Sequence, residues 1–324
     1  MQRFVQFLSE SEIQFDFLCE NSMLLIEKLI QFNQGRQYGQ IVFLAGGAGS
    51  GKGFAKSNFL DDRLFKTRDV DEWKKAFMFM SKDSRYMSYH VAIHRDRKGK
   101  MTDVDVLKNL TPNLEYGPGV EIKALHDLKL REPEDVSVLH IAVKKLGIKN
   151  KTLDLLFQDM KADRLPNIIF DITLKDMEDI TEIIPRLKEA GYQAKNIHIV
   201  WVLADYHVAV HANKTRERVV DDKILLKTHE GAANTMYDII RSKQVPGLDG
   251  SIHVILNNRD QTVFWELPDG SKTDVIKGFT YLTLKREGKP FEDEQEVNSQ
   301  LMDWIKDNIP RTKDTGHIWS QGIV

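Results

Sequence analysis

The chain is expected to adopt an α/β fold in which helices flank a mostly parallel sheet. Short apolar segments recur along the sequence, at 40–45, 166–171, 197–203 and 252–256. Helical patterns separate them, and strands that are apolar on both faces indicate a parallel sheet covered on each side. A glycine-rich turn directly after the first apolar segment is the third observation behind this expectation.

The composition is that of an ordinary globular chain, and it limits the function classes. The 324 residues are 41% hydrophobic and 29% charged, with a formal net charge of −2. Proteins that bind nucleic acid without specificity usually carry a basic excess, which this chain lacks. The single cysteine, Cys19, excludes an intrachain disulfide and a cysteine-based zinc site. No apolar run approaches membrane length, so we expect no membrane partner and a cytoplasmic location.

Three regions are predicted: an N-terminal helix within 1–37, a core over 38–258 and an appendage over 259–324. The first helix, over Glu10–Gln34, carries an apolar stripe that suits docking on the core or on a partner. The appendage is expected to hold strands at 262–265 and 279–284, with turn residues at 267–270 between them. These form a C-terminal β-hairpin, and a helix over about 292–309 follows.

The predicted core contains an inserted segment at about 83–150. Its first part, to about residue 130, is polar, carries Pro112 and Pro118, and predicts irregular structure. The continuation over 136–160 predicts helices with a break near Gly147.

The turn after the first strand carries the pattern of a P-loop, a phosphate-binding loop. Glycines allow backbone N–H groups to converge on phosphate oxygens, and the N-terminus of the following helix adds positive potential. A lysine in this position reaches toward the β- and γ-phosphates. The residues expected to bind ATP are Gly46, Gly47, Ala48, Gly49, Ser50, Gly51, Lys52, Gly53 and Phe54.

The loop departs from the usual pattern in one position, because Gly53 stands where a Ser or Thr hydroxyl normally binds Mg²⁺. The metal must then be held by water, by Ser57 or by an acidic residue elsewhere. Asp171 ends an apolar strand and is a candidate to orient Mg²⁺, and Asp69 is a second candidate.

The candidate catalytic residues follow two other strands. Asp71 comes at the end of a short strand expected at about 65–71, and it is the preferred base for an acceptor hydroxyl. Alternatively, Asp71 caps the helix that follows. Asp69 is the alternative base. Arg216 and Arg218 follow the strand that ends at Leu203, where a lid could stabilise the charge that develops during phosphoryl transfer. Alternatively, the charged segment around Arg216 and Arg218 is a solvated surface without a catalytic role.

Taken together, these segments resemble the zeta-toxin-like P-loop kinases. The matching pieces are Gly-Gly-Ala-Gly-Ser-Gly-Lys at 46–52, Asp-Val-Asp-Glu-Trp-Lys at 69–74, Asn-Ile-Ile-Phe-Asp-Ile-Thr at 167–173 and the arginine-rich segment leading into Thr-His-Glu at 228–230. The resemblance covers roughly 38–258. It implies ATP-dependent transfer to a hydroxyl, with Lys52 on the phosphates, Asp71 as base and Arg216 or Arg218 over the transferred group.

The resemblance leaves the acceptor open. Toxins of the family phosphorylate UDP-N-acetylglucosamine and relatives act on other acceptors, while this chain differs at Gly53, in the insertion and after residue 258. An antitoxin-type partner is a further implication. The alternatives are a kinase acting on nucleic acid, for which the basic run at 94–100 and nearby tyrosines supply material, and a regulatory or assembly protein that binds nucleotide without transfer.

Overall fold

The computed structural model describes residues 38–60, 62–82, 89–108, 117–158, 160, 165–257, 263–266, 268–270, 272–278, 280–292 and 295–309. The predicted N-terminal helix over Glu10–Gln34 lies outside the described residues. No helix in the described part of the chain is long and apolar enough to span a membrane.

A six-stranded sheet forms the centre of the molecule, with the strand order β11-β8-β7-β1-β6-β2. Its strands are β1 (Ile41–Ala45), β2 (Lys66–Asp69), β6 (Ile168–Asp171), β7 (Ile197–Ala204), β8 (Ile252–Asn257) and β11 (Thr280–Lys285). All neighbouring pairs are parallel except β11 with β8. The predicted α/β fold is therefore confirmed, and the carboxyl ends of five strands meet at one edge.

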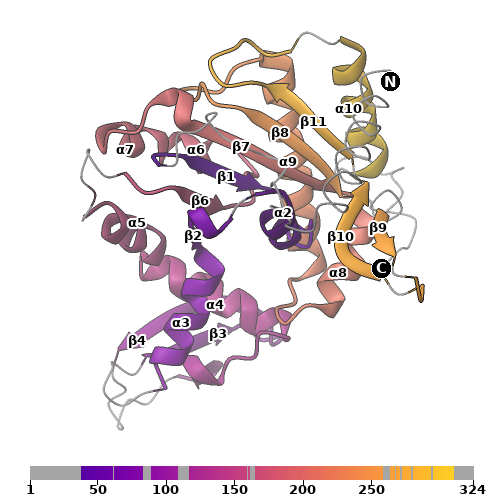
Figure 1. The fold of residues 1–324 in the computed structure, drawn as a ribbon. Helices are drawn as coiled ribbons and strands as arrows, with labels where there is room; N and C mark the ends of the chain where they lie inside the picture. The colour runs from indigo at the N-terminus through magenta and orange to yellow at the C-terminus, as the bar shows by residue number, and fades with distance from the viewer. Residues whose placement is uncertain are drawn as a thin grey trace.

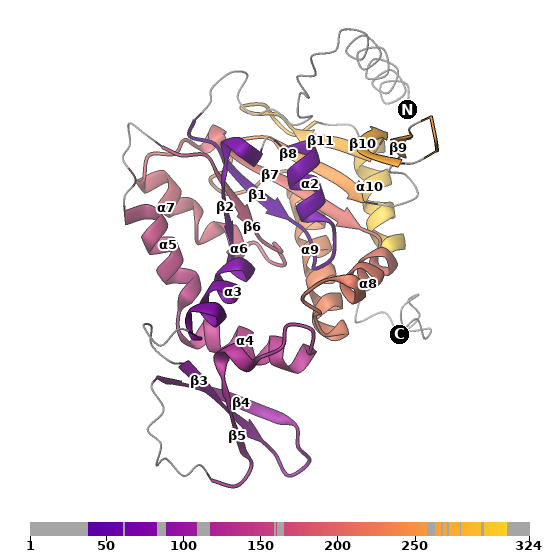
Figure 2. The ribbon, with the colours of Figure 1, turned by 60° about the horizontal axis from the view of Figure 1, so that its bottom comes forward.

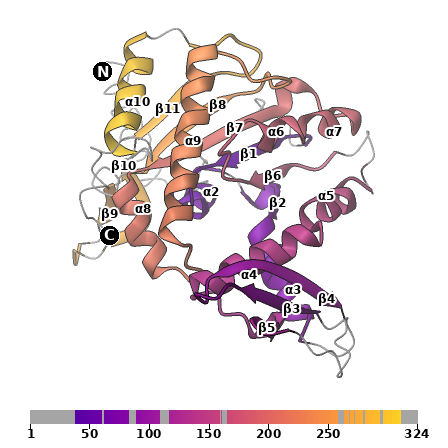
Figure 3. The same ribbon diagram turned by 180° about the vertical axis from the view of Figure 1, so that it is seen from behind.

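Helices cover both faces of this sheet, as the apolar strands require (Figures 1 and 3). On one face α2 (Lys52–Phe59) packs through Ala55 and Phe59 against Val42 and Val200. On the other face lie α6 (Glu178–Thr181), α7 (Ile184–Glu189), α9 (Asp222–Ser242) and α10 (Gln295–Asn308). Alternate residues of β1, β6, β7 and β8 enter the two separate cores, which is why these four strands are mostly apolar on both faces.

The inserted segment has regular structure, so the prediction of irregular structure up to residue 130 is wrong. Strands β3 (Tyr89–Arg95), β4 (Met101–Lys108) and β5 (Val120–Ala124) form an antiparallel sheet in the order β4-β3-β5. Val91, Ile93 and Val104 pack beneath α4 (Pro133–Lys145) in a core of their own. These strands mix apolar with polar and charged residues, a weaker signal than the apolar runs of the main sheet.

Figure 2 shows this small sheet beyond the main one, with α4 between them. The predicted helix break near Gly147 is confirmed, since α5 (Ile148–Gln158) begins directly after it. The remaining elements are α3 (Val70–Met80), α8 (Tyr206–Thr215) and the 3₁₀ turns η2 (Asp62–Leu64), η3 (Leu125–Asp127) and η4 (Ala194–Asn196).

The C-terminal region differs in part from its prediction. A hairpin does form around residues 267–270, between β9 (Val263–Glu266) and β10 (Lys272–Gly278). The strand predicted at 279–284 instead becomes β11 and pairs with β8 at the edge of the main sheet. Leu301 and Ile305 of α10 enter the main core. The last strand and helix thus complete the core, because β8 would otherwise leave an open sheet edge.

A buried histidine links folding to pH. Ser251 donates its N–H to His198 Nδ1 at 2.9 Å, so the Nε2–H of His198 donates to Gln40 Oε1 at 2.8 Å. Burial lowers the pKa of His198 to about 3, whereas an unfolded histidine titrates near pH 6.5. The unfolded chain therefore binds a proton that the folded chain excludes between these values. Stability is complete above about pH 6.5 and falls as the pH drops toward 3.

We expect the free energy of unfolding to fall by about 2 kcal/mol between pH 7 and pH 5 through His198 alone. Urea denaturation at both pH values measures this difference. His198→Asn, which retains an acceptor for Ser251, is expected to show a smaller pH dependence. His94→Asn serves as the control, because His94 lies exposed on β3. Equal pH dependence in the His198 variant and the unmodified protein would contradict the assignment.

Candidate functional site

The candidate site lies where the parallel strands end. The phosphate loop follows β1, Asp171 ends β6, Asp69 ends β2, and Asn257 ends β8. In the sheet register Asp69 lies beside Asp171, and Leu44 lies on the other side of Asp171. Ligands of open α/β sheets bind at this edge, so the predicted site residues are brought together by topology.

Three side chains, two from α9 and one from β8, hold the phosphate loop in place. His229 of α9 donates from Nε2 to the carbonyl of Ala48 at 2.7 Å, and Thr228 Oγ1 accepts from the N–H of Ala48 at 3.3 Å. Asn257 donates from Nδ2 to the carbonyl of Ser50 at 2.7 Å. Burial lowers the pKa of His229 to about 4, so the ring is neutral at pH 7. His229 therefore packs against the loop.

Two glycines of the loop are required by these contacts. A Cβ at Gly47 would lie 2.5 Å from the His229 ring. Gly51 has a φ of 91°, and a Cβ there would lie 2.4 Å from Asn257 Nδ2. Gly53, by contrast, has open space around the position of a Cβ. The loop therefore has the tight backbone that phosphate binding needs, whereas the unusual glycine after Lys52 is not forced by packing.

The side chain of Lys52 folds back onto the start of the phosphate loop. Its ammonium donates to the carbonyls of Gly46 at 2.8 Å and Gly47 at 3.4 Å, and lies 3.6 Å from Asp171 Oδ1. The side chain is 14% exposed, so its charge is partly desolvated. Ser50 Oγ is buried in the same loop and has no hydrogen-bond partner among the residues described. Both features suit a loop that gains hydrogen bonds when an anion enters.

Asp171 and Asp69 supply oxygen atoms beside the loop. Burial raises the pKa of Asp171 above its usual value, and the charge of Lys52 acts in the opposite direction. Asp69 accepts from the N–H of Asp71 at 2.7 Å and so caps α3. The capping role that the sequence offered as the other reading of Asp71 therefore belongs to Asp69.

The two carboxylates fit the predicted magnesium role. Mg²⁺ is usually held by one or two carboxylates together with phosphate oxygens and water. The described residues contain no group of three or more His, Cys, Asp or Glu side chains that could hold a metal ion. A buried carboxylate with a raised pKa also gains from a nearby cation.

Asp71 lies at the centre of an ion-pair network. Lys74, one turn along α3, donates to Asp71 Oδ1 at 2.9 Å, and Arg218 pairs with Oδ2. Burial raises the pKa of Asp71, but Arg218 and Lys74 outweigh it, so that the pKa falls to about 2. The side chain of Asp71 is still 39% exposed. The carboxylate is therefore ionised, held in place and accessible.

The two candidate arginines differ in their contacts. Arg218 pairs with Asp71, and its Nε is buried without a partner among the described residues. Arg216 forms no hydrogen bond or ion pair with any residue that the structure describes. Burial and the charge of Arg218 lower the pKa of Arg216, while Asp71 and Asp171 act in the opposite direction. Arg216 is thus a half-buried cation near the carboxylates with no partner of its own in the described residues.

The segment between α8 and α9 that carries both arginines is anchored at several points. The side-chain amide of Asn213 donates to the carbonyl of Val220 at 2.7 Å and accepts from the N–H of Val220 at 3.1 Å. Val219 donates its N–H to the carbonyl of Leu130 in the inserted segment at 3.0 Å, and Glu217 lies 3.4 Å from Lys75 of α3. The predicted lid segment therefore contacts both α3 and the insertion.

Three neighbours of the site were not among the predicted residues. Lys74 follows Asp71 by three residues on a helix, a spacing that could have indicated the pair. Asn257 ends a predicted strand at the ligand edge, which is also a usable signal. His140 of α4 lies 3.5 Å from Lys74 through Nδ1, and nothing in the local sequence around it indicates that contact.

Two side chains of the basic run at 94–100, His94 and Arg95, pair with nearby carboxylates. His94 lies 2.9 Å from Asp105, and Arg95 pairs with both Glu121 and Glu134. Asp96 caps the turn from β3 to β4 by accepting the N–H of Lys98 and Lys100. The side chains of His94 and Arg95 are thus paired, whereas Arg97, Lys98 and Lys100 lie exposed in the turn, as expected of a solvated loop. Of the tyrosines considered with it, Tyr86 and Tyr116 lie outside the described residues.

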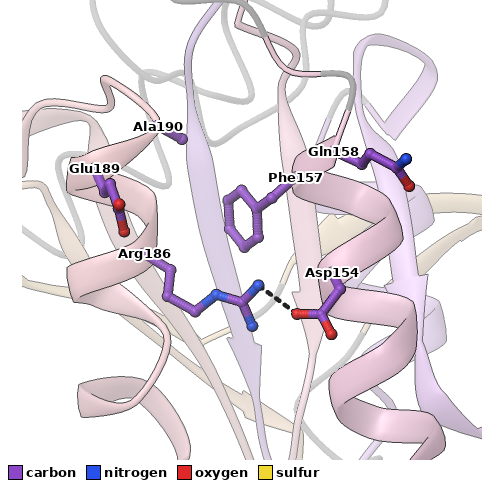
Figure 4. Close-up of a pocket in the computed structure, with 6 residues that line it drawn as sticks. All are labelled: Asp154, Phe157, Gln158, Arg186, Glu189 and Ala190. Atoms are coloured by element: carbon purple, nitrogen blue, oxygen red, sulfur yellow. Dashed lines mark hydrogen bonds and ion pairs between the residues drawn. The ribbon is translucent and has the colours of Figure 1, made fainter.

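A hollow of about 460 Å³ lies elsewhere, between α5 and α7 (Figure 4). In it Arg186 pairs with Asp154 at 2.7 Å and stacks over Phe157 at 5.0 Å. The hollow lies beside the residues that lead into β6 and β7, at the opposite ends of the strands from the phosphate loop. It is therefore separate from the candidate site.

Comparison with known families supports the likeness suggested by the motifs. Residues 149–267 match the Zeta toxin family model. The predicted resemblance is confirmed. The Zeta toxin-like region runs from α5 to just past β9, so it contains Asp171, both candidate arginines and His229, whereas the phosphate loop lies before it.

Other comparisons add less. A solved structure described as the AvrRxo1-ORF1:-ORF2 complex is similar with a TM-score of 0.39 and 12% identity, covering 81% of this chain and 63% of that one. This chain therefore spans less than two thirds of that neighbour. Comparison with curated proteins gives no match.

Proposed function

We propose that this protein is an ATP-dependent phosphotransferase that moves the γ-phosphate to a hydroxyl of a small-molecule or nucleotide-type acceptor. The observation that carries the proposal is the position of an accessible, ionised Asp71 at the sheet edge where the phosphate loop also opens. Phosphoryl transfer needs positioning and charge stabilisation more than covalent chemistry. A phosphate cradle, a carboxylate for the hydroxyl and an arginine that has no ion-pair partner among the described residues supply these parts.

Each residue has a separate duty in this proposal. The loop N–H groups and Lys52 bind the phosphates, and Asp71 orients the acceptor hydroxyl and receives its proton. Arg216 stabilises the charge on the transferred group, and Arg218 fixes Asp71. Asp171 and Asp69 hold Mg²⁺, which supplies further charge neutralisation when bound. The site binds the two substrates on opposite sides of the transferred phosphate, as direct transfer requires.

Two other readings are less well supported. A kinase acting on nucleic acid would need a basic groove, whereas His94 and Arg95 of the basic run pair with nearby carboxylates and the rest of the run forms an exposed turn. A nucleotide-binding protein without transfer is suggested by Gly53, but it leaves the Asp71 network without a purpose. The antitoxin-type partner implied by the family resemblance stays a prediction.

The test is transfer of label from γ-labelled ATP in the presence of Mg²⁺ to three acceptor pools: sugar nucleotides, 5′-hydroxyl oligonucleotides and DNA with hydroxymethylated bases. We expect label in one small-molecule pool and at least a 100-fold loss in Lys52→Ala. Lys56→Ala is the matched control, because Lys56 lies one turn further on the same helix and its ammonium donates to Thr67 Oγ1 at 3.5 Å rather than to the phosphate loop. ATP binding that Lys52→Ala abolishes, without transfer to any pool or to water, would favour the non-catalytic reading.

A further inference from the structure

Two side chains from outside the phosphate loop hold two of its carbonyl groups. His229 of α9 donates to the carbonyl of Ala48 at 2.7 Å, and Asn257 at the end of β8 donates to the carbonyl of Ser50 at 2.7 Å. Each contact therefore fixes the orientation of one peptide unit of the loop, the unit that follows Ala48 and the unit that follows Ser50.

The geometry of the peptide bond carries this constraint to the next residue. The peptide bonds are trans in the described part of the chain, and the C=O and N–H of a trans peptide point in opposite directions. The carbonyl held by His229 therefore turns the N–H of Gly49 away from α9. In the same way, the carbonyl held by Asn257 turns the N–H of Gly51 away from the end of β8.

The two N–H groups oriented in this way are available to a ligand. None of the described residues accepts a hydrogen bond from the N–H of Gly49 or Gly51. By contrast, the N–H of Ala48 donates to a threonine hydroxyl of α9, and the N–H of Ser50 donates to the carbonyl of Gly47 at 3.2 Å. Backbone donors in a partly buried loop gain free energy when an acceptor reaches them, so the two glycine amides suit an anion.

The donor groups that hold the carbonyls are themselves fixed by packing. His229 is 3% exposed, and its ring meets the ring of Tyr206 edge to face with 5.9 Å between the centroids. The ring also lies so close to Gly47 that a Cβ there would be 2.5 Å away. Asn257 lies in register with Ala204 of the neighbouring strand β7. Donors fixed before the ligand arrives need no reorganisation when it binds.

We propose that His229 and Asn257 are positioning residues of the phosphate loop, each holding one carbonyl so that the next N–H points at a phosphate oxygen. His229 orients the N–H of Gly49, and Asn257 orients the N–H of Gly51. The inference rests on the proposed function and deepens it. Without either contact the corresponding peptide unit can rotate, so affinity for a chain of phosphates falls even when the loop residues themselves are unchanged.

The first test measures phosphate binding without an acceptor and without transfer. The full chain is titrated calorimetrically with inorganic triphosphate and Mg²⁺. His229→Ala and Asn257→Leu are each expected to raise the Kd about tenfold or more. His229→Gln, whose amide can donate in place of Nε2, is expected to recover part of the loss. Thr235→Ala is the matched control, because Thr235 is buried on the same helix and its hydroxyl donates to the carbonyl of Gly231 rather than to the loop.

The second test observes the two amides separately. In backbone-assigned ¹H–¹⁵N spectra of the unmodified protein, triphosphate is expected to shift the signals of both Gly49 and Gly51. His229→Ala is expected to reduce the shift of Gly49 and to leave that of Gly51, and Asn257→Leu is expected to do the reverse. A general loss of stability would instead reduce both shifts alike in each variant.

The outcomes separate the two proposals. An unchanged Kd in His229→Ala or Asn257→Leu, no recovery in His229→Gln, or an equal loss in Thr235→Ala overturns the inference while the proposed transfer stands. Equal reduction of both glycine shifts in each variant also overturns it, as does a protein that binds ATP but not triphosphate. No binding of either ligand by the unmodified protein overturns the proposed function, and the inference falls with it.

Discussion

Arg216→Ala is expected to lower kcat for phosphoryl transfer by about 10³-fold or more, with little change in ATP affinity. Arg216 is half-buried and forms no ion pair within the described part of the chain, although the carboxylates of Asp71 and Asp171 are close enough to affect its pKa. A cation left without a partner in such a place is ready to bind an anion. Charge on the transferred phosphoryl group, which is spread over its oxygens in the transition state, is the anion that this site would provide.

Steady-state kinetics and equilibrium binding of ATP check this prediction together. Lys214→Ala is the matched control, because Lys214 is an exposed cation two residues earlier in the chain. Similar losses of kcat in both variants would show that general positive charge, rather than Arg216, supports the reaction. A large rise in the ATP Kd of Arg216→Ala would instead place this side chain on the bound nucleotide in the ground state.

Asp71→Asn is expected to reduce kcat by about 10² to 10⁴, the usual contribution of a positioned proton acceptor. The amide keeps the shape of the side chain but cannot take up the proton of the hydroxyl. Because the pKa of Asp71 is about 2, the carboxylate is ionised throughout the neutral range. Activity should therefore show no loss from protonation of Asp71 between pH 8 and pH 5.

The rate of transfer and the thermal unfolding temperature of Asp71→Asn are both measured. The second measurement detects any loss of stability, because the amide leaves Lys74 and Arg218 without their counter-charge. Glu72→Gln is the matched control: Glu72 is the next residue, is exposed and, within the described ranges, forms an ion pair with Lys75 alone. Full activity in the Asp71 variant, or an acid limb that it removes, would contradict the assigned role.

The main sheet and its ligand edge could be predicted from the sequence because their signals are local. Each apolar strand, such as Ile197–Ala204, is buried along its whole length. The phosphate loop is likewise a continuous motif. Parallel strands then align their carboxyl ends, so Asp69 and Asp171 meet although about a hundred residues separate them.

Features that depend on tertiary contacts could not be predicted in this way. The strands of the insertion are about half polar, and their apolar residues form a core only together with α4. β11 has the alternating pattern of a hairpin strand, and only the open edge of β8 decides where it pairs. His140 reaches Lys74 across 66 residues of sequence, and nothing near it in the chain indicates the contact. The pairing of Arg218, rather than Arg216, with Asp71 depends in the same way on how the lid segment docks.

The inserted segment has one further consequence, for how proteins of this shape can diversify. It forms its own core from β3, β4, β5 and α4, and it leaves and re-enters the main domain between α3 and β6. The proposed phosphate-binding loop lies in a different stretch of chain, at 46–53. A contiguous replacement of the insertion can therefore change what is presented opposite Asp71 and leave the pairing of β1, β2 and β6 intact. Related proteins can therefore acquire new substrates by replacing the inserted segment while they keep the main domain and its phosphate loop.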